Sequence, residues 1–344
     1  MNVNLVTGAT GVLGIQLVIA LIKRGQQVFA MYTSEKSLNW SKKVLKFEQI
    51  MDPQLSLIEW RRADLDDMET IDTLLKSCSR VFHCAAIVSY RRDERRKMYS
   101  TNVEGTRLLV NLCLERPEIR FCHVSSIAAI GRAPGVTELD EESEWIESSH
   151  NTHYAISKHW AELEVWRALH EGLNACIVCP GFIIGPGRPD RSSNSVIPSV
   201  AMNTGIYPPG GTAFIAAKDC ANYMIQIMDT DKVGERYILA EENLSHREFF
   251  GRIASALNIS PPQREAGILL LSAAVIYSRF KEWLGGMKNQ VTFESIRNAS
   301  VCYQYKTEKF REVCGQDPSM ASNLSAAIKD SVKFYMQNKS ANLD

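Results

Sequence analysis

The chain has 344 residues, of which 45% are hydrophobic and 23% are charged, a composition typical of a globular protein with an ample core. Lysine plus arginine and aspartate plus glutamate number 39 each, so the charge gives no reason to expect a nucleic-acid or anionic-membrane partner. The length suits one large domain with an appended lobe, or two domains.

The first half of the chain alternates short apolar runs with helical patterns. We expect strands at 3–6, 28–32, 55–60, 81–85, 121–124 and 175–178, and helices at 11–24, 66–78, 97–114 and 152–170. The strands are apolar almost throughout, which is typical of parallel strands buried on both faces. This order predicts an α/β fold with a doubly wound parallel Rossmann sheet.

The amino-acid composition changes after Pro180. Residues 181–211 are rich in Gly, Pro, Ser and Asn and predict a loop with one short helix near 196–202, followed by a strand at 237–240. From residue 245 the patterns are helical, at 247–257, 266–284, 292–299, 307–314 and 323–336. We therefore expect an NAD(P)-binding domain of residues 1–182 plus 212–240, and a smaller, mainly helical C-terminal substrate lobe of residues 183–211 and 241–344.

The sequence predicts a cytoplasmic protein with no integral membrane segment. The N-terminus runs straight into an apolar strand rather than a signal peptide. The longest apolar stretch, 267–277, is shorter than a membrane span. The nine cysteines favour reduced thiols. Cys176 and Cys179 lie inside a strand-like run, so their side chains should leave opposite faces, and we expect no metal site there.

Three glycines follow the first expected strand and open a helix. Gly8, Gly11 and Gly14 have the spacing GxxGxxG rather than GxGxxG. A turn without Cβ atoms lets a helix N-terminus approach phosphate, and the N–H groups and the helix dipole favour the anion. The sequence therefore predicts a dinucleotide site.

The end of the second strand bears on the choice of cofactor. An acid there would bind the ribose 2′-hydroxyl of NAD, and a base the 2′-phosphate of NADP. Thr33 and Ser34 can donate hydrogen bonds to a phosphate and Lys36 can add charge, whereas Glu35 argues the other way. On balance the segment favours NADP(H) over NAD(H).

Tyr154 and Lys158 stand four residues apart in an expected helix and so share one face. A free tyrosine has a pKa near 10, too high for ready proton exchange at neutral pH, and a lysine cation beside it favours the tyrosinate. Ser126 follows the fifth strand, at the edge where α/β sheets bind ligands. The three side chains predict proton transfer to or from a carbonyl oxygen during hydride transfer.

The motifs together resemble the extended short-chain dehydrogenase/reductases, the NAD-dependent epimerase/dehydratase family. The resemblance covers residues 3–240 and is closest to the dihydroflavonol-reductase and 3β-hydroxysteroid-dehydrogenase branch. It is carried, in chain order, by residues 7–14 (TGATGVLG), Asp64-Leu65, Cys84-Ala85-Ala86, 102–106 (NVEGT), Val124-Ser125-Ser126, Tyr154 with Lys158, and Pro180 with Gly185-Pro186-Gly187.

The resemblance implies roles for individual residues. Tyr154 would be the acid/base, Lys158 would hold the ribose and lower the tyrosine pKa, and Ser126 would hydrogen-bond the substrate oxygen, with Ser125 as the alternative. Asn102 would support a water-linked proton path. Asp64 and Leu65 would flank the adenine. The cofactor would also contact Gly8, Thr10, Gly11, Val12, Leu13, Gly14, Cys84, Ala85, Ala86, Ser125, Pro180, Gly181 and Ile183. Family members often form a homodimer through the helices at 97–114 and 152–170.

The sequence also narrows the reaction. Dehydratases of the family carry an Asp-Glu pair after the catalytic Ser/Thr, where this chain has Ile127 and Ala128. An epimerase would need cations for a nucleotide diphosphate, which Arg188, Arg191 and Arg236 could supply. Apolar residues in the tail suggest an apolar substrate lobe, although a core helix explains them equally well: 268–271, Ala273, Val275, Ile276 and Trp283.

We therefore predict an NAD(P)-dependent oxidoreductase that interconverts a ketone and a secondary alcohol on a fairly apolar small molecule. A nucleotide-sugar epimerase is the first alternative, and a non-catalytic NAD(P)-binding protein is the second. His153 adjoins Tyr154 and could touch the substrate, whereas His83 and His123 lie in strands, where a core histidine is the ordinary interpretation.

Overall fold

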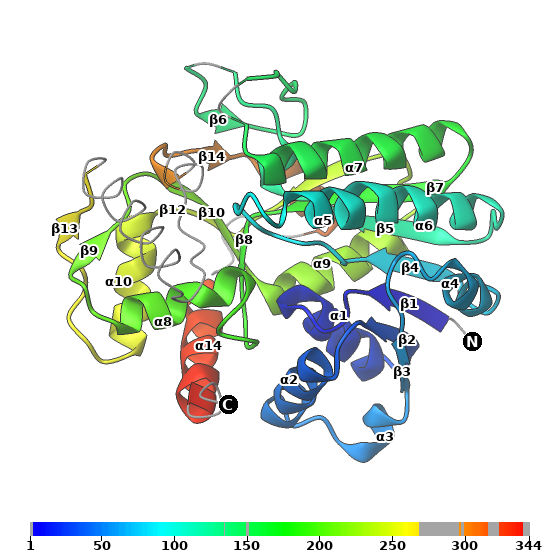
Figure 1. Ribbon diagram of the computed structural model, residues 1–344, viewed down its shortest axis with the longest axis horizontal. Helices are drawn as coiled ribbons and strands as arrows, with labels where there is room; N and C mark the ends of the chain where they lie inside the picture. The colour runs from blue at the N-terminus through cyan, green and yellow to red at the C-terminus, as the bar shows by residue number, and fades with distance from the viewer. Residues whose placement is uncertain are drawn as a thin grey trace.

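The computed structural model describes residues 3–133, 135–148, 151–267, 296, 299–315 and 323–339 (Figure 1). The apolar residues 268–283 of the expected substrate lobe, most of the helix expected at 266–284 and nearly all of that at 292–299 lie outside the described residues.

A seven-stranded parallel sheet forms the centre of the molecule, in the order β11-β7-β5-β4-β1-β2-β3. From β1 the chain proceeds outward to β3, and then returns to add β4 on the other side of β1, so the strand order reverses between β1 and β4. This confirms the doubly wound fold, whose ligands bind where the order reverses. The strands are β1 (Val3–Thr7), β2 (Gln27–Tyr32), β3 (Ile58–Arg62), β4 (Arg80–His83), β5 (Arg120–Val124), β7 (Asn174–Pro180) and β11 (Arg236–Leu239).

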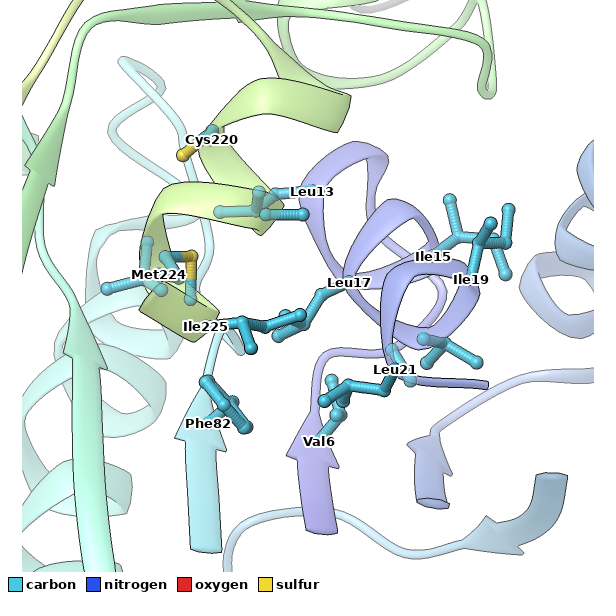
Figure 2. Packing of buried hydrophobic residues seen from close by; sticks show 14 of the residues in the cluster. Val6, Leu13, Ile15, Leu17, Ile19, Leu21, Phe82, Cys220, Met224 and Ile225 are labelled. Atoms are coloured by element: carbon cyan, nitrogen blue, oxygen red, sulfur yellow. The ribbon is translucent and has the colours of Figure 1, made fainter. Parts of the chain in front are cut away.

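Helices cover both faces of this sheet (Figure 1). One layer contains α1 (Val12–Lys23), α2 (Glu35–Phe47) and α9 (Ala217–Asp229), and the other contains α4 (Met68–Leu75), α5 (Arg95–Tyr99), α6 (Gly105–Leu114) and α7 (His153–His170). Figure 2 shows Leu17 of α1 and Ile225 of α9 pointing toward each other above Phe82 of β4. Each face of the sheet has its own apolar core. Cys176 lies in the core under α1 and α9, and Cys179 lies in the core under α6 and α7, so the two thiols leave opposite faces of β7, as predicted.

Several elements differ from the sequence prediction. Helix α2 was not expected, although Ser34 accepts a hydrogen bond from Ser37 N and caps it. Helix α9 was also missed, although its buried residues fall at helical spacing: Cys220, Ala221, Met224, Ile225 and Met228. The strand expected at 55–60 starts at Ile58, because residues Asp52–Leu55 form the short helix α3.

A second, smaller sheet lies beside the first and joins β8 (Phe182–Ile184), β10 (Gly211–Ala216) and β12 (Glu242–Ser245). It packs with helices around a third core in which Phe214 and Phe249 stack with centroids 4.0 Å apart. The helices are α8 (Val196–Ala201), α10 (His246–Ala256) and α14 (Leu324–Asn338). Strand β10 comes from the segment expected in the cofactor domain, yet it pairs here. The division into two domains therefore stays a prediction.

The remaining elements are short. Strand β6 (Glu138–Leu139) pairs with β14 (Gln304–Tyr305), β9 (Ile206–Tyr207) pairs with β13 (Arg264–Glu265), and α13 (Glu308–Val313) follows β14. Within the described ranges, every helix is too short or too polar to cross a bilayer.

Candidate active site

The turn after β1 is built so that only glycine fits. Gly8 has φ +63°, and a Cβ there would lie 2.7 Å from the backbone of Ala85. A Cβ on Gly14 would lie 2.2 Å from the carbonyl oxygen of Gly8. The first turn of α1 is thereby held against the ends of β1 and β4. Its N-terminal N–H groups form the kind of cradle that a pyrophosphate requires.

Among the other residues expected around this turn, all but Leu13 are at least partly accessible. Thr10, Val12, Cys84 and Ala85 are half-buried, and Gly11 and Ala86 are exposed. Leu13 is buried, and its side chain points toward α9 in the core (Figure 2), so only its backbone can face a cofactor.

The segment after β7 reaches the same place. Pro180 ends β7, Gly181 N donates to Leu239 O, and Ile183 lies in β8 opposite Ile215. A Cβ on Gly187 would lie 3.0 Å from the Val12 side chain. Residues 185–187 therefore lie against the start of α1.

A second basic residue, Arg62, lies near the end of β2 in addition to Lys36. Thr33 and Lys36 are exposed, and the Ser34 hydroxyl caps α2. Glu35, the argument against NADP, accepts a hydrogen bond from the Tyr32 hydroxyl at 3.1 Å. Arg62 stands opposite Tyr32 in the sheet register, and the sequence reasoning overlooked it because it ends a different strand.

Asp64 and Leu65 follow β3 on the same edge of the sheet. Asp64 is exposed, and its carboxylate accepts from Leu65 N at 2.8 Å. Leu65 is buried against the position of Gly105. Its side chain is therefore part of the core, and Asp64 is the better placed of the two to face an adenine.

Tyr154 lies in the first turn of α7. Thr152 fixes the start of this helix, because its Oγ1 accepts from Ala155 N at 3.0 Å. The Tyr154 ring is half-buried and meets the Tyr90 ring edge-on at 6.5 Å. Burial raises the pKa of Tyr154, and a hydrogen bond with the Ser126 side chain acts in the opposite direction.

Ser126 rather than Ser125 faces the tyrosine. Ser126 is half-buried, and its Oγ also accepts from Ala128 N at 3.1 Å. Ser125 is buried, and its hydroxyl donates to the carboxylate of Glu162 in the interior. The structure therefore brings Ser126 and Tyr154 together, as predicted, and gives Ser125 another partner.

Lys158 lies one turn after Tyr154 and is 2% exposed. Its Nζ donates to the carbonyl oxygen of Val124 at the end of β5, at 2.7 Å. Burial lowers the pKa of Lys158 to about 8, against the negative charge of Glu162, which raises it. The expected lowering of the tyrosine pKa by this lysine stays a prediction.

Asn102 occupies a π-helical turn, Ser100–Glu104, between α5 and α6, a deviation often found at functional sites. Its side chain donates to Ile87 O and to Ser157 Oγ, both at 3.0 Å, and accepts from Ile87 N at 2.8 Å. Ser157 in turn donates to the backbone oxygen of Tyr154 at 2.8 Å. Asn102 thus supports the helix turn that carries Tyr154, and its role in a water path stays a prediction.

Several of these histidines and arginines have identifiable partners, but neither ring nitrogen of the buried His123 makes a hydrogen bond. His83 bridges Thr7 and Thr106 at 2.8 and 2.9 Å, as a core histidine does, and His153 hydrogen-bonds Tyr99 at 3.1 Å. Arg188 makes two hydrogen bonds to Asp190, at 3.0 and 2.6 Å, and Arg236 is paired with Glu162. Arg236 therefore faces the interior rather than a diphosphate, and Glu162 is a site residue that the sequence reasoning missed.

Comparisons with known proteins identify the family and agree with the fold. Residues 4–240 match the NAD dependent epimerase/dehydratase family. The chain is 30% identical to sterol demethylase protein B of Methylococcus capsulatus, over 78% of this chain and 80% of that one. It is 26% identical to a putative dihydroflavonol 4-reductase of Synechocystis, over 97% and 94% of the two chains. The crystal structure of gox2253 superimposes with a TM-score of 0.76 at 27% identity, covering 98% of this chain and 99% of that one.

Proposed function

The chain belongs to the NAD-dependent epimerase/dehydratase family of extended short-chain dehydrogenase/reductase enzymes, and from this premise we propose that it interconverts a ketone and a secondary alcohol with NADP(H). The observation that carries the proposal is the hydrogen bond between Ser126 and Tyr154, with Lys158 one turn further along α7, at the same edge of the sheet as the glycine turn. The substrate would be a fairly apolar small molecule.

In this proposal each side chain has a definite task. The Tyr154 phenol donates its proton to the carbonyl oxygen in reduction and removes the hydroxyl proton in oxidation. Ser126 donates a hydrogen bond to the same oxygen, and the Lys158 ammonium favours the tyrosinate that remains. The nicotinamide, when bound, supplies or accepts the hydride. The glycine turn would hold its pyrophosphate, Asp64 its adenine and Lys158 its ribose, with Pro180 near the nicotinamide.

The surroundings of β2 support NADP(H) over NAD(H). Lys36 is exposed near the strand end, and Arg62 stands opposite Tyr32. Two cations there suit the 2′-phosphate. Glu35, which would repel it, is held by the Tyr32 hydroxyl.

Three observations support an apolar ketone rather than a sugar nucleotide. Ile127 and Ala128 follow Ser126 in a short 3-10 turn and cannot perform the acid/base work of a dehydratase. Arg188 and Arg236, two of the three arginines considered for a diphosphate, are engaged by Asp190 and Glu162. The names of the two relatives contain a sterol and a dihydroflavonol, both uncharged ring compounds.

We also propose that two copies pair through α5, α6 and α7. Trp160 and Leu163 of α7 are 47% and 50% exposed, and the Tyr99 ring lies 5.4 Å from that of Trp160. Large apolar side chains gathered on an exposed helix face favour an interface. A cytoplasmic location suits the six buried free thiols.

The test compares cofactors and substrates on the purified protein. Apolar ring ketones should be reduced faster with NADPH than with NADH. Tyr154→Phe should lower turnover by about 10²–10⁴-fold while NADPH binding, measured by fluorescence, stays intact. Tyr223→Phe, which changes a tyrosine on α9, should leave turnover unchanged.

Three results would contradict the proposal. Full turnover by folded Tyr154→Phe would remove the acid/base assignment. UDP- or GDP-sugars that raise the melting temperature more than the ketones do would indicate an epimerase. Tight NADPH binding with no turnover across the panel would indicate a non-catalytic dinucleotide-binding protein.

A further inference from the structure

A buried carboxylate lies behind Tyr154 and Lys158. Glu162 is one turn beyond Lys158 on α7 and is 1% exposed. It accepts hydrogen bonds from the Ser125 hydroxyl, from Cys179 Sγ at 3.4 Å and from Arg236 Nη1 at 3.2 Å. A buried carboxylate without such partners would be strongly unfavourable. The donors stand at β5, β7 and β11, so this one side chain ties three strands to α7.

Arg236 is itself fixed in position. Its Nη2 donates to the backbone oxygen of Glu141, whose own carboxylate accepts from Ile238 N at 2.8 Å. Burial raises the pKa of Glu162, and the positive charge of Arg236 is the largest influence that lowers it. The guanidinium therefore favours the ionised form of Glu162.

Lys158 needs a counter-charge, because its ammonium is almost wholly buried and donates a hydrogen bond to the neutral carbonyl of Val124. The titratable groups around it come from every neighbouring element. They are Tyr154 and Glu162 on α7, His83 on β4, Cys84 after β4, His123 on β5 and Cys179 on β7. Burial lowers the pKa of His83 to about 3 and that of His123 well below its usual value, so both rings are neutral at pH 7. Glu162 lies four residues beyond Lys158 on the same face of α7 and is equally buried. Its ion pair is with Arg236, and its negative charge acts on the Lys158 ammonium through space.

We propose that Glu162, held by Arg236 and Ser125, is a positioning residue that keeps Lys158 charged beside Tyr154. This inference rests on the proposed function, because it gives Lys158 the role of the cation next to the acid/base. Glu162 touches neither substrate nor cofactor and acts through Lys158. Its contact with Ser125 also fixes the strand end that carries Ser126.

The test measures the pKa of Lys158 directly, in the intact chain without substrate. Lysine labelled with ¹³C at Cε gives one NMR signal per lysine, and loss of a signal in Lys158→Met assigns it. Glu162→Gln removes the negative charge while keeping the shape. It should lower the pKa of Lys158 by about one unit or more, the usual effect of an adjacent opposite charge. The alkaline limit of ketone turnover should move to lower pH with it.

A second variant covers the case in which Glu162→Gln does not fold. The double change Glu162→Met with Arg236→Met removes both buried charges together, an exchange that proteins often tolerate, and should also lower the pKa of Lys158. Arg252→Gln breaks a comparable ion pair with Glu242 in the smaller sheet and should leave that pKa unchanged.

The inference fails if the pKa of Lys158 is unchanged in a folded Glu162 variant. That failure is distinct from failure of the proposed function, which would show as a wild-type protein that reduces no ketone while the NMR titration still gives a result. A smaller turnover number with an unmoved pH limit would also overturn the inference, since it would indicate a structural role alone.

Discussion

Lys158 makes the stability of the protein depend on pH. Burial lowers its pKa from 10.5 to about 8, so between these values the unfolded chain binds more protons than the folded one. The free energy of unfolding therefore rises with pH across this window. Relative to Lys158→Met, which has no such group, the wild type should gain about 3 kcal/mol between pH 7 and pH 10.5, at about 1.36 kcal/mol per unit.

Urea unfolding of the two proteins at a series of pH values measures this gain. Other lysines and tyrosines titrate in both proteins and cancel in the difference. A difference that stays constant from pH 7 to pH 10.5, or that moves in favour of Lys158→Met, would contradict the prediction.

Gly14 offers a second prediction at the level of single residues. Its alanine Cβ would lie 2.2 Å from Gly8 O, so Gly14→Ala must displace the turn that we propose binds the cofactor. We expect a loss of about 1–3 kcal/mol in unfolding free energy and weaker NADPH binding by titration calorimetry. Gly251→Ala, in α10 with nothing within 4 Å of the added Cβ, should instead be neutral or stabilising by about 0.5–1 kcal/mol. Unchanged NADPH affinity in Gly14→Ala would show that the turn does not bind the dinucleotide.

At the level of elements, the start of α7 fixes the position of Tyr154. Thr152 is buried and caps this helix through Ala155 N, and Tyr154 follows two residues later. Thr152→Ala should cost about 1 kcal/mol of stability and lower turnover, because the turn that holds the phenol can fray. Thr152→Ser keeps the hydroxyl and should retain most of both. Equal losses in the two variants, by urea unfolding and initial rates, would show that the cap is not the cause.

The elements also show what the sequence could predict. Buried parallel strands and amphipathic helices have local patterns, and their alternation along the chain predicted a doubly wound parallel sheet. Helix α2 was missed because the segment after β2 was considered only as a cofactor contact, although Ser34 is a good N-cap. The π-helical turn Ser100–Glu104 has no local pattern in the sequence, and the partners of Asn102 within it, Ile87 and Ser157, are 15 and 55 positions away.

For the molecule as a whole, parallel strands explain why the candidate site could be assembled from the sequence. Strands β1, β4, β5 and β7 are parallel, so Gly8, Ala85 and Ser126, which follow the first three, and Pro180, which ends β7, meet at one edge of the sheet. The pairing of Glu162 with Arg236 could not be predicted from the order and direction of the strands. The two residues are 74 positions apart, and no local pattern indicates which of many charged residues is turned inward.

The predicted dimer is a property of the whole molecule, and its test is separate from that of the active site. Trp160 and Leu163 are three residues apart on α7 and share an exposed face. In a two-fold dimer the same patch meets itself, so one charge introduced there appears twice across the interface. Leu163→Glu should therefore shift the protein from dimer to monomer in size-exclusion chromatography with light scattering. Met202→Glu, at the end of α8 and 72% exposed, should remain dimeric. A wild-type protein that runs as a monomer would refute the dimer and leave the chemistry of Tyr154 unaffected, because Tyr154, Ser126 and Lys158 all come from one chain.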